Sequence, residues 1–128
     1  MSSPEGPAGG VSALLVVEDD RLLRWSLREK FKAAGWRVIE AGSGFAGLEA
    51  AAGLPLALAL VAVSLPDLDG AALAARLAAA HPECRIVLMA SAERPETIAR
   101  RPGEWPVIEK PFDLDEIVRW AASPGRGT

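Results

Sequence analysis

The sequence predicts a single α/β domain built on a five-stranded parallel sheet with helices on both faces. Two observations predict this fold class. Short apolar runs alternate five times along the chain with segments of helical periodicity, which is the pattern of strand–helix units in a parallel sheet. The apolar runs are continuous rather than alternating, as is typical of strands buried on both faces. A chain of 128 residues is long enough to bury the core of one such domain.

Each element carries its own signal. The run ALLVV at 13–17 predicts the first strand. The segment 20–34 places Leu27 and Phe31 on one apolar stripe of a helix, and Gly35 follows it as a C-terminal capping residue does. We expect further strands at 36–40, 56–63, 85–90 and 106–109, and further helices at 45–52, 71–80, 95–101 and 113–122.

The two ends of the chain differ in composition from the middle. Residues 1–11 are rich in Ser, Pro, Gly and Ala, and residues 123–128 (SPGRGT) have a similar character. We expect the first segment to be a flexible tail and the second to be a flexible tail or the start of a linker. The folded domain is therefore expected at 12–122.

The composition argues against several classes of protein. The net charge is −3, so the domain has no electrostatic reason to bind nucleic acid by itself. The single cysteine, Cys84, cannot form an internal disulfide or a multi-cysteine metal site. No apolar run approaches the roughly 18 residues that a membrane span needs, and the N-terminus lacks the pattern of a secretion signal. We expect a soluble cytoplasmic domain that does not contact a membrane.

Charged side chains follow the strands at the edge of the sheet where function is expected. In doubly wound sheets, functional groups gather at the carboxyl ends of the strands. Glu18 and Asp19 follow the first strand, and Lys110 follows the fifth. Carboxylates bind Mg²⁺, and an ammonium neutralises phosphoryl oxygens, so this set is suited to a divalent cation and a phosphoryl group. Each signal alone is also typical of helix caps and ordinary surface.

In this order the motifs resemble one family, the response-regulator receiver domains of two-component signalling. The resemblance covers nearly all of the expected domain. It implies a flavodoxin-like fold with strand order 2-1-3-4-5. It also implies an aspartate at the end of the third strand that accepts a phosphoryl group from a histidine kinase in the presence of Mg²⁺. The motifs that carry the resemblance are VVEDD at 16–20, SLPDLDG at 64–70, IVLMAS at 86–91 and EKPFDLDE at 109–116.

The chain departs from the family pattern at three positions. The acceptor aspartate lies four residues before the proline of the turn, and that position is Ala62 here, whose methyl group is no nucleophile. The hydroxyl position at the end of the fourth strand falls on Ala90, with Ser91 one step later, and the aromatic switch position falls on Val107. We therefore expect a receiver-like signalling domain that is not phosphorylated at the usual site, is not an enzyme and acts through protein–protein contacts.

The loss of an acid at position 62 changes what the other site residues can do. By the resemblance, Asp19 is the chief Mg²⁺ ligand. With one ligand and one charge fewer, we expect metal binding to be weak or absent and no cofactor to be required. Weaker repulsion among the carboxylates leaves Lys110 able to pair with Glu18 or Asp19 as a structural bridge. The implied partners are a kinase, an output domain or another regulator.

Two other functions remain open. One is a phosphorylation-competent receiver that uses a nearby acid, Asp67 or Asp69. The other is a small nucleotide-binding enzyme, because Gly42, Gly44 and Gly47 form a literal G-x-G-x-x-G between a strand and a helix. This run follows the second strand rather than the first, and no acid ends the next strand. The simpler interpretation is that these glycines shape a turn and allow close packing on the sheet.

Tryptophan and arginine residues in the second half of the chain indicate an interaction face. By the resemblance, this face is formed by the fourth helix, the fifth strand and the fifth helix, and it is a candidate for docking or homodimerisation. Trp with Arg is typical of interface hot spots, and the residues are Arg100, Arg101, Trp105, Arg119 and Trp120. Elsewhere, we expect Trp25 to be exposed, Trp36 to pack, His81 to cap a helix and Cys84 to be a small buried hydrophobe.

Overall fold

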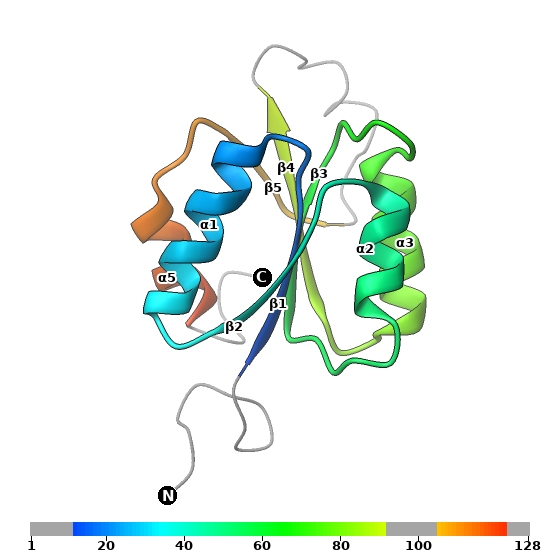
Figure 1. Ribbon diagram of the computed structural model, residues 1–128, viewed down its shortest axis with the longest axis horizontal. Helices are drawn as coiled ribbons and strands as arrows, with labels where there is room; N and C mark the ends of the chain where they lie inside the picture. Colours follow the sequence, from blue (N-terminus) through cyan, green and yellow to red (C-terminus); the bar gives the residue numbers. More distant parts are fainter. Residues whose placement is uncertain (1–11, 92–104, 123–128) are drawn as a thin grey trace, which may run out of the picture.

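The computed structural model describes residues 12–91 and 105–122. One parallel sheet has the strand order β2-β1-β3-β4-β5, and Figure 1 shows α1 and α5 on one of its faces and α2 and α3 on the other. The strands are β1 (Ala13–Val17), β2 (Arg37–Ala41), β3 (Leu58–Ala62), β4 (Arg85–Ser91) and β5 (Val107–Lys110). The helices are α1 (Arg21–Ala33), α2 (Gly44–Ala51), α3 (Gly70–Ala80) and α5 (Leu114–Ala121). The expected fold class and strand order are confirmed.

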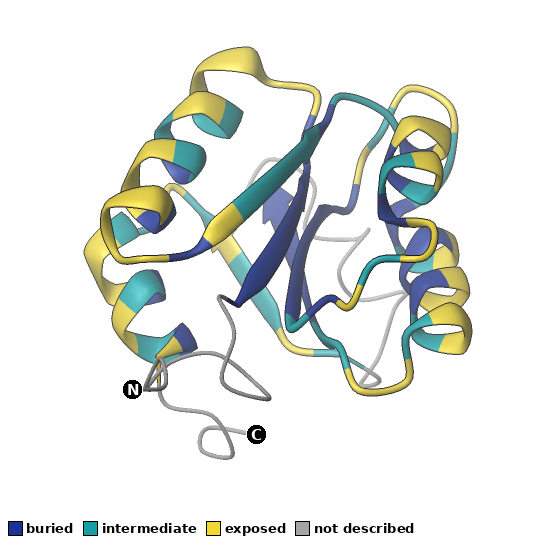
Figure 2. Cartoon of the chain, turned by 60° about the horizontal axis from the view of Figure 1, so that its bottom comes forward, coloured by how far each residue is buried: buried dark blue, intermediate teal, exposed yellow. Residues whose placement is uncertain are grey.

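Each face of the sheet has its own core, because side chains along a strand alternate between the two faces. Figure 2 shows β1 and β3 buried along their whole length, as their continuous apolar sequences require. We call the core under α1 and α5 the α1–α5 core; its strand residues are Leu14, Val16, Leu58, Leu60, Ala62, Val87 and Met89. The core under α2 and α3 is the α2–α3 core, with strand residues Ala13, Leu15, Val17, Ala41, Ala59, Val61, Ile86, Leu88 and Ala90.

Local signals explain where α1 begins and ends. The carboxylate of Asp20 accepts hydrogen bonds from the N–H groups of Leu22 and Leu23, which would otherwise have no partner in the first turn. Gly35, just after the helix, has a φ of 99°, a left-handed conformation that glycine adopts without steric cost. The chain then turns so that Trp36 meets Phe31 edge-on, with ring centroids 5.5 Å apart. The expected packing of Trp36 is confirmed.

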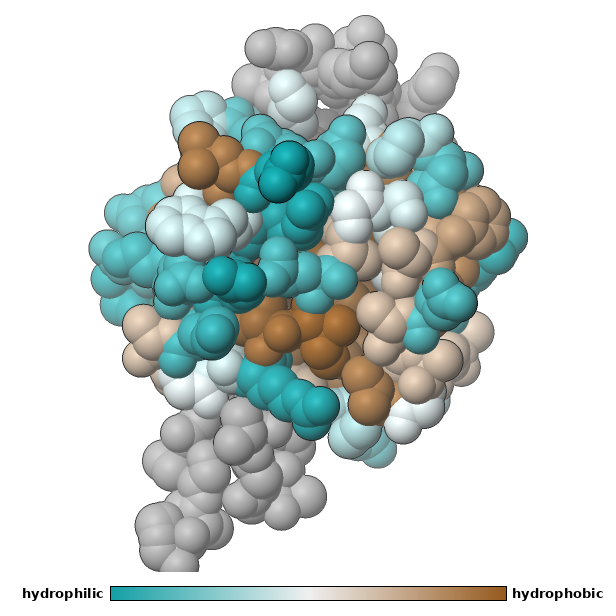
Figure 3. All heavy atoms as spheres, in the orientation of Figure 1, coloured by the Kyte–Doolittle hydropathy of each residue, from teal (hydrophilic) through white to brown (hydrophobic). Residues whose placement is uncertain are grey.

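The observed bounds differ from the expected ones by one or two residues, as the ends of helices and strands usually do. The predicted helix at 95–101 and the predicted tails at 1–11 and 123–128 lie outside the described residues. No helix within the described ranges is long and apolar enough to cross a membrane. In Figure 3, the surface over α1 is mostly hydrophilic, whereas the surface over α2 and α3 is much more apolar.

Candidate functional site

Four strand-end positions share one face at the carboxyl edge of the sheet. Glu18 continues the alternation of Leu14 and Val16, and Ala62 continues that of Leu58 and Leu60, all on the side of the α1–α5 core. On the outer strands, Met89 and Ile108 pack on the same core. The positions two residues further along these strands, Ser91 and Lys110, lie opposite each other in the register of β4 and β5. The candidate site is therefore built from Glu18, Ala62, Ser91 and Lys110.

A buried ion pair dominates this site. Lys110 Nζ lies 2.8 Å from Glu18 Oε1, and the Glu18 side chain is only 1% exposed against 26% for Lys110. Oε1 lacks a hydrogen bond of regular geometry, so the contact is a Coulombic pairing of the two charges. The other oxygen, Oε2, accepts a hydrogen bond from the Asp20 N–H at 3.0 Å. Of the two partners that the sequence left open for Lys110, the structure selects Glu18.

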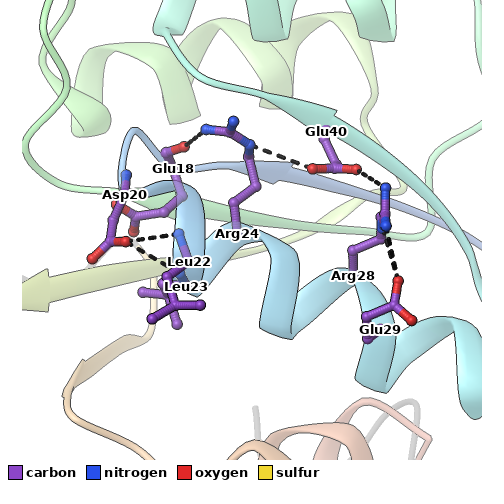
Figure 4. Close-up of polar contacts among 8 residues, drawn as sticks. All are labelled: Glu18, Asp20, Leu22, Leu23, Arg24, Arg28, Glu29 and Glu40. Carbon is purple, nitrogen blue, oxygen red and sulfur yellow. Dashed lines mark hydrogen bonds and ion pairs between the residues drawn. The ribbon is translucent and has the colours of Figure 1, made fainter.

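Arg24 of α1 supports the backbone that carries Glu18. Its Nη1 donates a hydrogen bond of 2.6 Å to the Glu18 carbonyl oxygen, and its Nε lies 3.4 Å from Glu40 Oε1 on β2. Figure 4 shows this guanidinium between the two acidic residues, with Glu40 continuing to Arg28. The sequence analysis missed Arg24. Its only signal is its place in the first turns of the helix that follows the acidic run.

The position that the resemblance assigns to the acceptor carries a buried methyl group. Ala62 is 1% exposed. It belongs to the α1–α5 core together with Leu60 of β3 and Met89 of β4. Position 62 faces the side of the sheet on which Glu18 and Lys110 meet. The structure therefore places no acidic side chain at the point where the resemblance requires the nucleophile.

Ala90, the hydroxyl position by the resemblance, stays a prediction, but its side chain lies on the other face of the sheet. Ala90 packs in the α2–α3 core, on the face of the sheet opposite to Ala62, because one step along a strand reverses the side chain. Ser91 therefore has the face of Met89 and Ala62, so the end of β4 presents a hydroxyl residue to the site. Val107, the expected aromatic switch position, is half-buried against the same core as Ala90.

The remaining acids do not complete a metal site. Asp19, the metal ligand implied by the resemblance, is exposed, and Asp20 caps α1. The Glu18 carboxylate is paired with Lys110, and a methyl group stands at position 62. Within residues 12–91 and 105–122, no three His, Cys, Asp or Glu side chains gather as a metal site. The residues present therefore do not fit the Mg²⁺ ion that the family implies.

Asp67, which was considered as an alternative phosphoryl acceptor, instead caps the start of α2. Its carboxylate accepts hydrogen bonds from the N–H groups of Gly44 at 2.8 Å and Phe45 at 3.0 Å, at the start of α2. The Phe45 hydrogen bond is the main cause that lowers the pKa of Asp67, and burial opposes it. The carboxylate thus occupies the helix N-terminus where the glycine run would have to bind a phosphate.

Two glycines are fixed by close packing rather than by ligand binding. A Cβ at Gly47 would lie 2.8 Å from Val17 Cγ2, so α2 approaches β1 closely, as the simpler interpretation of the glycine run predicted. A Cβ at Gly70 would lie 2.1 Å from the Ala62 carbonyl oxygen. The Gly70 N–H also donates to the Val63 carbonyl at 2.9 Å. The SLPDLDG turn therefore closes directly onto the backbone at the acceptor position.

The expected interaction face is only partly described. Arg100, Arg101 and the fourth helix lie outside the described residues. Trp105 is half-buried against the α2–α3 core, and Trp120 is half-buried against the α1–α5 core. The Arg85 guanidinium carbon lies 4.8 Å from the centroid of the Trp120 ring. Both described tryptophans of this face therefore make contacts within the chain.

Three smaller expectations concern isolated residues. Trp25 is 51% exposed, and His81 occupies the C-cap of α3, as expected. Cys84 is half-buried rather than fully buried, and burial raises the pKa of its thiol to about 12. The largest exposed apolar side chain beside Trp25 on α1 is Leu22, which is 72% exposed; the sequence analysis did not single it out.

The fold and the site define a class of protein before any comparison is made. The chain is a doubly wound α/β domain with charged side chains at the carboxyl edge of its sheet, where such folds carry their function. A sequence model described as the response regulator receiver domain matches residues 14–122. The chain belongs to this family of two-component signalling domains.

Individual relatives agree with this assignment. Over 108 residues the chain is 39% identical to the transcriptional activator protein PfeR of Pseudomonas aeruginosa, covering 81% of this chain but only 34% of PfeR. It is 30% identical over 109 residues to the response regulator receiver protein CpdR of Brucella abortus, covering 82% of this chain and 89% of CpdR. The signal receiver domain of an HD domain-containing protein from Pseudomonas fluorescens shares the fold, with a TM-score of 0.77 at 22% identity over 88% of this chain and 94% of that one.

Proposed function

We propose that this receiver domain does not accept a phosphoryl group and transmits information through contacts with other proteins. The observation that carries the proposal is the buried methyl group of Ala62 at the acceptor position. Phosphoryl transfer to a receiver requires a carboxylate oxygen as nucleophile, and Glu18, an acid on the same face, is paired with Lys110. The module has no catalytic activity of its own in this proposal, needs no cofactor and binds Mg²⁺ weakly or not at all.

The two alternatives have less support. Asp67 would have to leave two backbone N–H groups at the start of α2 before it could act as an acceptor. The same contacts argue against a nucleotide at the glycine run, since its phosphate would compete with a carboxylate that is already in place. Asp69 stands at the N-cap of α3, beyond the end of β3.

Mass spectrometry after incubation with acetyl phosphate and Mg²⁺ tests the proposal. We expect no added phosphoryl group on the wild-type chain. The Ala62→Asp variant is the matched control, because it restores a carboxylate at the acceptor position while Ser91 and Lys110 stay in place, and we expect it to become labelled. A phosphoryl group on any aspartate of the wild-type chain would contradict the proposal.

The partners proposed for this module are a kinase, an output domain or another regulator, with homodimerisation through the face of Trp105, Arg119 and Trp120 as a further proposal. Light scattering on the wild type and on Trp120→Ala tests the dimer. A wild-type monomer at high concentration would remove the dimer from the proposal and leave docking of a different protein. A cytoplasmic location stays a prediction.

A further inference from the structure

We propose that Lys110 is the resident cation of this site, and that its ion pair with the buried Glu18 holds the ends of β1 and β5 together without a divalent metal ion. The inference rests on the proposed function in one respect, which is that no acid stands at position 62. It goes beyond that function because it assigns a structural task to the residues that remain. The domain would then have one fixed arrangement of its carboxyl edge.

The first argument is the distance that the pair spans. In the order β2-β1-β3-β4-β5, β1 and β5 are separated by two strands, or about 14 Å at the usual strand spacing. The side chains of Glu18 and Lys110 nevertheless meet at 2.8 Å. They do so on the face that carries Ala62, which lies on a strand between them. A carboxylate at position 62 would compete for the ammonium before it reached Glu18, whereas a methyl group does not.

The second argument is the burial of the anion. Glu18 is 1% exposed, and an ionised carboxylate out of water is strongly unfavourable unless a positive charge accompanies it. The hydrogen bond from the Asp20 N–H serves only one of its oxygens. The ammonium serves the other. Lys110, at 26% exposed, can return to water if Glu18 is removed. Glu18 therefore needs Lys110 for its stability more than Lys110 needs Glu18.

The third argument is that the acids nearest in sequence are engaged or exposed. Asp20 caps α1 through its carboxylate, and Asp19 is exposed to solvent. Lys110 therefore compensates the one buried carboxylate at this edge of the described residues. A divalent ion would have to displace this ammonium and would find one carboxylate fewer than a receiver that carries an acid at position 62. The chemistry of the site favours the built-in cation.

A double-mutant cycle in chemical and thermal unfolding tests the inference. Lys110→Met leaves a buried uncompensated carboxylate, so we expect its melting temperature to fall by roughly 10 °C or more. Glu18→Gln should cost much less, since Lys110 turns to solvent. The double variant should recover most of the loss caused by Lys110→Met, and Lys110→Arg should retain most of the wild-type stability. Additive losses in the cycle would overturn the inference.

Two further measurements complete the test. If Lys110→Met does not fold, a folded double variant still demonstrates the coupling, and an unfolded double variant counts against it. Millimolar MgCl₂ should leave the melting temperature of the wild type unchanged and should raise that of Ala62→Asp. Stabilisation of the wild type by Mg²⁺ would overturn the inference. If the wild type gains a phosphoryl group while Glu18 and Lys110 are still coupled in the double-mutant cycle, only the proposed function is contradicted. If the wild type gains no phosphoryl group but the losses of the two variants are additive, only this inference is contradicted.

Discussion

Two charged groups with buried polar atoms lie at opposite ends of the sheet and are accommodated in different ways. At the carboxyl end, Glu18 is paired with the ammonium of Lys110. At the amino end, Arg85 begins β4; its Nη2 donates to the Ala121 carbonyl oxygen at 2.7 Å, and the guanidinium faces the Trp120 ring. Burial lowers the pKa of Arg85, and its buried Nη1 has no hydrogen-bond partner among the described residues.

The two charges need different surroundings. A guanidinium is delocalised and weakly hydrated, so an aromatic face and a helix C-terminal carbonyl stabilise it without a counter-ion. A carboxylate has no equivalent substitute and requires a cation or several N–H donors. Loss of the partner should therefore matter more at the carboxyl end than at the amino end, and the predictions below test this ranking together with the packing around each end.

Apart from Lys110→Met, the largest effect is expected from Gly70→Ala at the carboxyl end. Its Cβ would lie 2.1 Å from a backbone oxygen of Ala62, so the turn must move, and we expect a loss of about 3 kcal/mol in the free energy of unfolding. Gly42→Ala is the milder comparison, because its Cβ would meet a side-chain nitrogen, Arg24 Nη1, at 3.2 Å rather than a backbone atom. We expect that variant to stay within about 1 kcal/mol of the wild type in urea denaturation. Equal losses at both positions would show that the close approach to the Ala62 carbonyl does not set the cost at position 70.

The next effect is expected from Arg85→Met at the amino end. The variant removes a helix-capping hydrogen bond and a cation–π contact but leaves no buried charge behind, so we expect a loss of about 1–2 kcal/mol. For comparison, Lys110→Met should cost about 3–5 kcal/mol. Arg85→Lys keeps the charge without the planar contact and should lie between Arg85→Met and the wild type. Denaturation of the three variants side by side decides the comparison, which fails if Arg85→Met costs as much as Lys110→Met.

A smaller effect is expected from Asp67, whose carboxylate caps α2. Because the folded-state pKa is lowered, chiefly by the Phe45 N–H, the contribution to stability is present above the ordinary value of 3.8 and is lost as the pH falls below it. Asp67→Asn should therefore make the acid limb of the stability profile shallower. If Asp67→Asn left the dependence of stability on pH unchanged at acid pH, the hydrogen bonds at the start of α2 would not favour the ionised form of Asp67.

The smallest effect on stability at neutral pH is expected from Cys84. Burial raises the pKa of the thiol from 9.0 to about 12, so the native chain should hold about a thousandfold less thiolate than the unfolded chain near pH 8. Iodoacetamide should alkylate the native chain slowly and the urea-unfolded chain rapidly, with Cys84→Ser as the unlabelled control. The folded state binds the proton more tightly, so stability should fall as the pH rises from about 9 towards 12. Rapid labelling of the native chain at pH 8 would contradict this.

The sequence predicted the fold well because the strands and helices are determined by short sequence patterns. Continuous apolar runs, helical stripes and a glycine after α1 are visible residue by residue, and the strand order came from the resemblance of motifs such as VVEDD. The ends of elements shifted by a residue or two because a strand ends where its register with a neighbour ends. Which residues of β4 face the site is likewise fixed by register, because Met89 pairs with Ala62 and packs in the same core.

The parts of the site that could not be predicted are contacts between distant segments. The sequence identified Glu18, Ala62 and Lys110 as site residues but could not say which acid the lysine meets. That choice depends on which side chain points into the α1–α5 core. The tie from Asp67 to the start of α2 joins residues more than twenty positions apart, and no local spacing indicates it. Arg24 was missed for the same reason.

The methyl group at position 62 also has a consequence for control in the cell. Under the proposed function, the domain has no phosphorylated and unphosphorylated forms that a kinase could interconvert at this position. The strength of its signal would then follow how many copies are present and how many partners compete for them. Regulation would act on synthesis, degradation and the supply of binding partners rather than on the protein's covalent state.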